Sequence, residues 1–157
     1  MNDVVRLTAA DAGELLTLQR AAYVPEAQHY RDPDLPPLTE TLDELRAALT
    51  SPDVVALGIR DAGRLVAAVR LRFADDVAHL GRLVVVPDLQ GQGLGSRLLR
   101  ACEDALPAGI GEIRLFTGSD SGPTVRLYER FGYVRERETD AGTHRLVHLV
   151  KRIGHAR

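Results

Sequence analysis

The stretch VVVPDLQGQGLGSRLLRAC, residues 84–102, decides how the rest of the chain is interpreted. It passes from β-branched residues through a proline and three alternate glycines, Gly91, Gly93 and Gly95, into a segment whose apolar residues have helical spacing. A strand that enters a helix in this way leaves unpaired backbone N–H groups at the helix start. Glycine lets a ligand approach the main chain, and the helix end adds partial positive charge. The glycines alone predict either a tight corner or a cradle for a pyrophosphate.

Two common nucleotide-binding motifs do not match this stretch. A P-loop needs Gly-Lys before Ser or Thr, whereas Gly95 is followed directly by Ser96. A dinucleotide-binding loop follows the first strand of a parallel βαβ unit, whereas this loop follows three strands that we expect to be antiparallel. Neither motif accounts for the glycines.

Apolar periodicity places this stretch in a mixed α/β chain. The expected strands are residues 4–7, 54–60, 64–74, 77–86, 110–117, 133–138 and 144–152. The expected helices are residues 10–23, 42–49, the segment from the glycines to about 106, and 121–132. The four prolines between residues 24 and 41 predict a long connection that is neither regular helix nor regular strand. A right-handed crossover through the long helix makes its two flanking strands parallel. We therefore expect a mostly antiparallel sheet of six to seven strands with helices on both faces.

Length and composition set limits on the function. The 157 residues are the usual size of one domain, so residues 1–157 are predicted to be a single domain. A formal charge of −2 without a run of basic residues argues against a nucleic-acid partner. The sequence shows neither a basic leader nor an apolar stretch of ~20 residues, which predicts a cytoplasmic protein without a membrane partner. Arginine replaces lysine everywhere except at Lys151, which indicates a GC-rich, bacterial type of coding bias.

Two motifs together resemble the GCN5-related N-acetyltransferases. RLVVVPDLQGQGLGSRLL, residues 82–99, is similar to that family's acyl-CoA motif, and LFTGSDSGPTVRLYERFGYV, residues 115–134, resembles its second motif. The expected order of strands and helices also matches, so the resemblance covers nearly the whole chain. It implies the acyl-CoA N-acyltransferase fold, with acetyl-CoA as cosubstrate and a primary amine of a small molecule or peptide as acceptor.

The resemblance implies which residues hold coenzyme A. The backbone of Leu83, Val84 and Val85 would pair with the pantetheine arm, as an open strand edge can. The backbone N–H groups of the loop would hold the pyrophosphate. These loop residues are Gln90, Gly91, Gln92, Gly93, Leu94, Gly95 and Ser96. Many members have arginine where this chain has Gln90, and Arg97 and Arg100 one turn on could compensate. The site of the 3′-phosphate is left open.

The second motif implies the acid for the leaving thiolate. Tyr128 matches the tyrosine that family members direct at the coenzyme A sulfur, although a tyrosine in this pattern is otherwise a core residue. Ser121 stands where many members have asparagine, and its hydroxyl could cap the helix or bond to the pantetheine arm. The following contact of the motif is Thr124. The oxyanion donor implied by the family is a backbone N–H near Val84 or Val85.

The general base and the acceptor pocket are less clearly marked. His79 has a usual pKa of ~6.5 and is our candidate base, although it alternates with apolar residues as an ordinary sheet histidine would. The long connection offers Glu26 and His29 as candidates for binding the amine. His144, His148 and His155 show no metal-ligand spacing, so no metal is predicted. Cys102 shares a helical face with leucines and is interpreted as a core residue rather than a nucleophile.

The sequence is compatible with three functions. The first is an N-acetyltransferase that works by direct transfer in a ternary complex, the second is a non-catalytic acyl-CoA sensor or interaction module, and the third is an unrelated enzyme of nucleotide phosphates. The resemblance favours the first. Dimerisation through the terminal strands is also left open, because no residue pattern bears on it.

Overall fold

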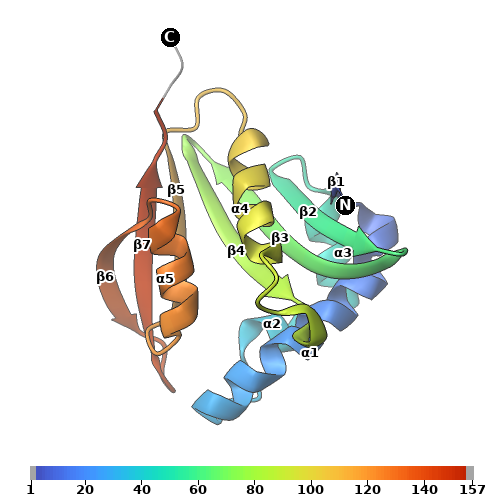
Figure 1. Ribbon diagram of the computed structural model, residues 1–157, viewed down its shortest axis with the longest axis horizontal. Coiled ribbons are helices and arrows are strands. Elements are labelled where there is room, and N and C mark those ends of the chain that lie inside the picture. Colours follow the sequence, from blue (N-terminus) through green and yellow to red (C-terminus); the bar gives the residue numbers. More distant parts are fainter. Residues whose placement is uncertain (1–2, 155–157) are drawn as a thin grey trace.

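Seven strands form one mixed sheet in the computed structural model, which describes residues 3–154 (Figure 1). The strands are β1 (Val4–Arg6), β2 (Val54–Asp61), β3 (Arg64–Ala74), β4 (Val77–Val85), β5 (Glu112–Gly118), β6 (Val134–Asp140) and β7 (Arg145–Arg152). They are ordered β1-β2-β3-β4-β5-β7-β6. Every neighbouring pair is antiparallel except β4 and β5, which are parallel. The sheet expected from the sequence is therefore confirmed.

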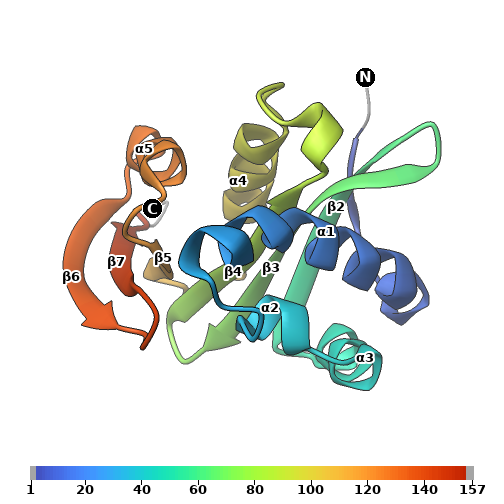
Figure 2. The same ribbon diagram turned by 90° about the horizontal axis from the view of Figure 1, so that it is seen from below.

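Helices cover both faces of the sheet (Figure 2). The helices α1, α2 and α3 lie on one face, and α4 and α5 lie on the other. Their bounds are α1 (Ala12–Tyr30), α2 (Pro36–Thr39), α3 (Leu42–Thr50), α4 (Leu94–Asp104) and α5 (Gly122–Arg130), with short 3₁₀ turns η1 (Ala9–Asp11) and η2 (Pro87–Leu89). A capping box begins α3, because Thr41 N donates to Glu44 Oε1 at 2.8 Å and Glu44 N donates to Thr41 Oγ1 at 3.1 Å.

The first helix is longer than the sequence predicts. It continues past Pro25 to Tyr30, whereas we expected an irregular connection after residue 23. A proline inside a helix removes one backbone hydrogen bond, and that loss is tolerated here because packing holds the following turn. Tyr30 lies against Gly118 of β5 and stacks on His144, with ring centroids 4.0 Å apart. Tertiary contacts therefore hold this segment helical in spite of Pro25.

The parallel pair β4 and β5 separates along its length. Only Val77, Ala78 and His79 pair with β5, and they pair with Glu112, Ile113 and Arg114 respectively. Figure 1 shows the two strands diverging beyond that point. On its other edge β4 pairs with β3 as far as Val85. The second half of β4 therefore has one edge that no strand of residues 3–154 covers.

Cys102 has the core position that the sequence predicts. Cys102 is fully buried on α4, and burial raises the pKa of its thiol to about 12. A thiol that stays protonated at neutral pH is a poor nucleophile, which agrees with the core role predicted for it. No helix in the described part of the chain is long and apolar enough to span a membrane.

Candidate active site

The glycine loop sits between the end of β4 and the start of α4. Gly91 and Gly93 have φ angles of 82° and 81°, and no atom lies within 4 Å of where a Cβ would be at either position. Both glycines therefore serve the backbone conformation and leave open space beside it. Gly95 differs, because a Cβ there would lie 3.4 Å from Leu127 Cδ2. Gly95, on α4, therefore faces Leu127 of α5 rather than open space.

A cavity of about 450 Å³, here named the loop cavity, opens beside this loop. Its lining combines the loop with β4 and α5: Leu83, Val85, Leu89, Gln90, Gly91, Gly93, Leu94, Gly95, Ser96, Pro123, Thr124, Leu127 and Arg130. Gln92 and Val84 are not in this lining, although both were predicted to contact coenzyme A. The glycines of the motif thus border a cavity, as the cradle interpretation requires.

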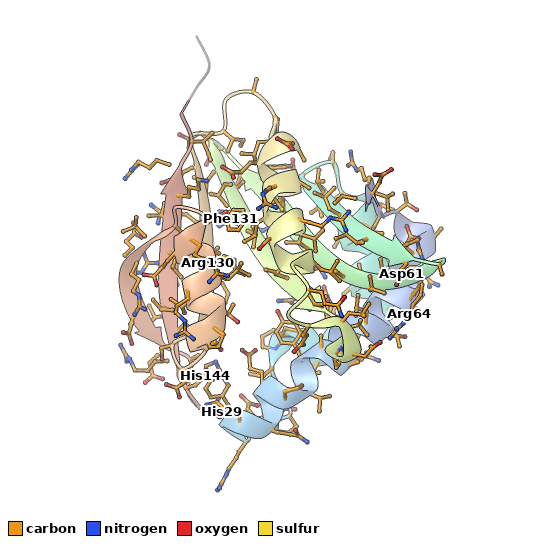
Figure 3. All side chains as sticks on the ribbon, viewed as in Figure 1. His29, Asp61, Arg64, Arg130, Phe131 and His144 are labelled. Carbon is orange, nitrogen blue, oxygen red and sulfur yellow. The ribbon has the colours of Figure 1, made fainter. Side chains whose placement is uncertain are left out.

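The charge beside the loop cavity comes from a residue that the sequence did not single out. Arg130, on α5 (Figure 3), lines the cavity. Arg97 and Arg100 are not in its lining. The Arg100 guanidinium instead lies over the Phe131 ring, 5.4 Å from its centroid. Arg130 could have been found from its position, because it follows the tyrosine of the second motif by two residues.

A second cavity of about 500 Å³, here named the central cavity, lies on the other side of the open edge of β4. It shares Leu83, Val85, Gln90 and Thr124 with the loop cavity. Gln90 Nε2 also donates to the carbonyl oxygen of Val85 at 3.3 Å. The two cavities therefore meet along the strand edge that was expected to bind the pantetheine arm.

Tyr128 lines the central cavity from α5 and is 5% exposed. Burial, with Tyr23 and Tyr133 nearby, raises the pKa of Tyr128 well above its usual value of 10. The Tyr133 ring packs edge-on against it, with centroids 5.6 Å apart. The phenol is thus protonated at neutral pH and held in place, so it can donate a proton.

Glu26 and His29 lie near each other on α1 but face different surroundings. Glu26 lines the central cavity. Burial raises the pKa of its carboxyl, and His144 opposes that shift. His29 is absent from the lining and lies 3.5 Å from Asp120, with 60% of its side chain exposed. Figure 3 shows His29 and His144 close together at the end of α1.

His79 lies at the paired end of β4 and lines neither cavity. Burial and the neighbouring cations Arg72 and Arg114 lower its pKa below the usual 6.5. The ring is therefore neutral at pH 7, as a base must be. The structure does not bring it together with Tyr128, and its catalytic role stays a prediction.

Ser121 is the residue that precedes α5, but its hydroxyl makes no capping hydrogen bond. Its carbonyl oxygen accepts from Val125 N at 2.9 Å. The capping that we considered for this hydroxyl is therefore wrong, because the residue's φ and ψ of −84° and 63° are not the extended geometry of a capping serine. Ser121 lines neither cavity, whereas Thr124 lines both.

Three residues of the central cavity escaped the sequence interpretation. Tyr23 and Arg82 enter it from α1 and β4, and His144 enters it from just before β7. They stand far apart in the sequence, and only Arg82, the first residue of the acyl-CoA motif, belongs to a motif, so the fold brings them together. Among residues 3–154, no three His, Cys, Asp or Glu side chains form a group that could hold a metal ion. His155 lies outside the described residues.

Comparison with solved structures gives the class of fold. The PaiA N-acetyltransferase from Thermoplasma acidophilum, solved in complex with coenzyme A, superimposes with a TM-score of 0.83 at 18% identity, over 98% of this chain and 99% of that one. The ribosomal-protein-S18-alanine N-acetyltransferase from Escherichia coli gives a TM-score of 0.82 at 20% identity, over 99% of this chain and 96% of that one. The fold is thus one that N-acetyltransferases use.

Sequence comparison then gives the family. The model of the Acetyltransferase (GNAT) family matches residues 14–133, and the chain belongs to this family. The S-(2-succino)cysteine N-acetyltransferase of Bacillus subtilis is 27% identical over 164 aligned positions, which cover 92% of each protein. The predicted resemblance is therefore confirmed.

Proposed function

We propose that this protein is an N-acetyltransferase that moves the acetyl group of acetyl-CoA directly to a primary amine of a small molecule or peptide. The observation that carries the proposal is the meeting of two cavities along the open edge of β4. One cavity is bordered by main-chain groups that suit a phosphate, and the other by titratable side chains that suit an amine. The shared wall is where an acyl group would pass from one to the other.

The residues present fit coenzyme A. The open edge of β4 offers backbone N–H and C=O groups to the amides of the pantetheine arm. The left-handed Gly91 and Gly93 free their loop for a pyrophosphate, and Arg130 adds a positive charge. Acetyl-CoA would supply the activated acyl group as a thioester. Loop residues 90–96 and Arg130 would together hold the pyrophosphate.

Tyr128 is proposed as the acid and Glu26 as the base. The amine nitrogen attacks the thioester carbonyl carbon, the carbon–sulfur bond breaks, and the Tyr128 phenol donates its proton to the departing sulfur. The Glu26 carboxylate takes the proton that the amine nitrogen loses, directly or through a water. Its raised pKa makes it a better proton acceptor than an ordinary carboxylate. His79 remains the second candidate for this role and is tested beside it.

The test combines an acceptor panel with one variant. Release of coenzyme A from acetyl-CoA is measured with free amino acids, polyamines and amino-terminal peptides, with S-(2-succino)cysteine included because the Bacillus subtilis relative acts on it. Tyr128→Phe is expected to lower kcat about 100-fold while leaving the Kd for acetyl-CoA unchanged within about twofold, because it removes only the proton donor. Binding of acetyl-CoA without turnover of any amine would instead identify a sensor.

A further inference from the structure

A largely buried ionic group of Glu40, Arg70 and Arg82 reaches the central cavity through Arg82, beside the open edge of β4. Glu40, which follows α2, accepts hydrogen bonds from Arg70 of β3 at 2.9 Å through both carboxylate oxygens. Gln19 of α1 donates from Nε2 to Glu40 Oε1 at 2.9 Å and to the Pro37 carbonyl oxygen at 2.8 Å. Both oxygens of the Glu40 carboxylate therefore already accept hydrogen bonds.

Arg82 of β4 is the second cation of this group, and no hydrogen bond joins its Nε to the carboxylate. Its Nε is 3.7 Å from Glu40 Oε1, which is beyond a hydrogen bond, and this nitrogen is buried without one. Arg70 and Arg82 carry two positive charges against one negative charge on Glu40. Burial alone would raise the pKa of Glu40, but the hydrogen bonds from Arg70 and Gln19 lower it to about 2, so the carboxylate stays ionised. The group therefore carries one uncompensated positive charge at the cavity wall.

The backbone at Arg82 is held in an uncommon conformation. Its φ is 54°, in the left-handed region, where the pairing of β3 with β4 shifts register. Among the described residues, three other non-glycine positions have positive φ, and Arg31, Ala62 and Asp75 all lie at a helix end or a tight turn. Arg82 alone lies within a strand. At this register shift the Arg82 side chain enters the lining of the central cavity, one residue before Leu83.

We propose that Arg82 binds a carboxylate of the acceptor, so that the acceptor is an amino-acid-like primary amine that carries a carboxylate. This inference rests on the proposed function, whose amine acceptor it defines. A guanidinium offers two parallel N–H donors that match the two oxygens of a carboxylate. Leu35, Leu80 and Leu146 also line the cavity and offer apolar surface to the rest of the acceptor.

The acidic residues of the same cavity suit a polyamine as well as an amino-acid-like acceptor. Asp32 is engaged, because it accepts from Thr143 Oγ1 and from the backbone N–H of Asp34, both at 2.9 Å. Glu26 and Asp34, which also line the cavity, are left to receive the amine. A polyamine would place no group opposite Arg82 and would leave its charge unmatched, whereas a carboxylate satisfies it.

The experiment uses the CoA-loaded full chain and pairs of ligands that differ only in the carboxylate. L-Methionine is compared with 3-(methylthio)propylamine and L-phenylalanine with phenethylamine, within a panel that also contains S-(2-succino)cysteine and spermidine. Binding is measured by calorimetry and transfer by release of coenzyme A. We expect at least one carboxylate-bearing amine to bind more tightly than its carboxylate-free partner and than spermidine.

Variants of Arg82 test whether this residue binds the carboxylate of the acceptor. Arg82→Met is expected to weaken binding of the preferred amino acid, and to raise its KM, roughly 10- to 100-fold, with little change for the carboxylate-free amine. Arg82→Lys keeps the charge but loses the fork, so an intermediate loss is expected. Arg46→Met, on the exposed face of α3, is the control for loss of one arginine. Unchanged affinity for acetyl-CoA shows that a variant is folded.

The outcomes separate the two proposals. Selective binding of amino acids that depends on Arg82, without any turnover, supports the carboxylate site and contradicts the proposed function. Transfer to spermidine or to carboxylate-free amines as efficient as transfer to amino acids, or an equal effect of Arg82→Met on both members of each pair, overturns the carboxylate site and leaves the function standing. Failure of every carboxylate-bearing amine to bind better than its partner also overturns it.

Discussion

The loop cavity and the central cavity share the edge of β4, yet they are built in different ways. The loop cavity is formed largely by one continuous segment, residues 89–96, whose main chain faces the open space. The central cavity is formed by side chains from α1, the α1–α3 connection, β4, β5, α5 and the β6–β7 hairpin. A main-chain site needs particular backbone angles, which glycines mark in the sequence. A side-chain site needs only that distant segments meet, and leaves no local mark.

The largest effect is expected from breaking the ionic group of Glu40, Arg70 and Arg82 beside the central cavity. Glu40→Gln leaves Arg70 and Arg82 buried without a counter-charge, so we expect the free energy of unfolding to fall by about 3 to 5 kcal/mol. Chemical denaturation at pH 7 measures this loss. An effect no greater than that of Glu44→Gln, a carboxylate on exposed α3, would show that the charges are already screened by solvent.

The same carboxyl gives the wild type a defined acid sensitivity. Its pKa falls from 4.5 to about 2 on folding, so its contribution to stability is complete above about pH 4.5 and is lost as the pH falls toward 2. Glu40→Gln should therefore flatten the dependence of stability on pH in this window. Equal slopes for the two proteins would contradict the assignment.

The next effect concerns the base in the central cavity. Glu26→Gln is expected to lower kcat about 100-fold, because the amide cannot accept a proton. In the wild type, kcat/KM should fall as the pH drops through the raised pKa of Glu26, since protonation removes the base. Initial rates from pH 5 to 9 measure this, with His79→Gln as the matched variant. A larger loss in His79→Gln than in Glu26→Gln would return the role to the histidine.

The smallest of these effects is expected on the main-chain side. Gly93→Val forces a β-branched residue toward a φ of 81°, so the loop should relax and lose its alignment of N–H groups. We expect the Kd for coenzyme A to rise roughly 10- to 100-fold. Gly109→Val is the control, because Gly109 has a φ of 93° with open space around it but lines neither cavity. Equal losses of affinity in both variants would point to general destabilisation.

The difference between the cavities also explains how much the sequence could predict. The order of strands, the parallel pair β4 and β5, and the motif glycines beside the loop cavity all follow from local patterns, and the structure agrees with them. Arg130 was missed because it occupies a position between the tyrosine and the glycine of the second motif to which no role was assigned. Gln92 was included because every residue of the motif was assigned a contact, whereas only some of them face the cavity.

The sequence predicted only some of the residues that line the central cavity. Glu26 was predicted because it lies in the segment whose prolines indicated a long, functional connection. The same prolines led us to end the first helix too early, at residue 23 instead of Tyr30. Arg82 and His144 depend on a register shift and on a hairpin that returns to α1. Both arise from pairing between strands, and no local pattern encodes either one.

The measurement that tests the account most directly is the initial-rate pattern of coenzyme A release with acetyl-CoA and an active amine varied together. Two cavities that meet along β4 predict that both substrates are bound at once, which gives intersecting lines in a double-reciprocal plot. The buried, protonated thiol of Cys102 agrees with this expectation, since it is unsuited to carry the acyl group. Parallel lines, the pattern of a covalent acyl-enzyme, would contradict direct transfer between the two cavities.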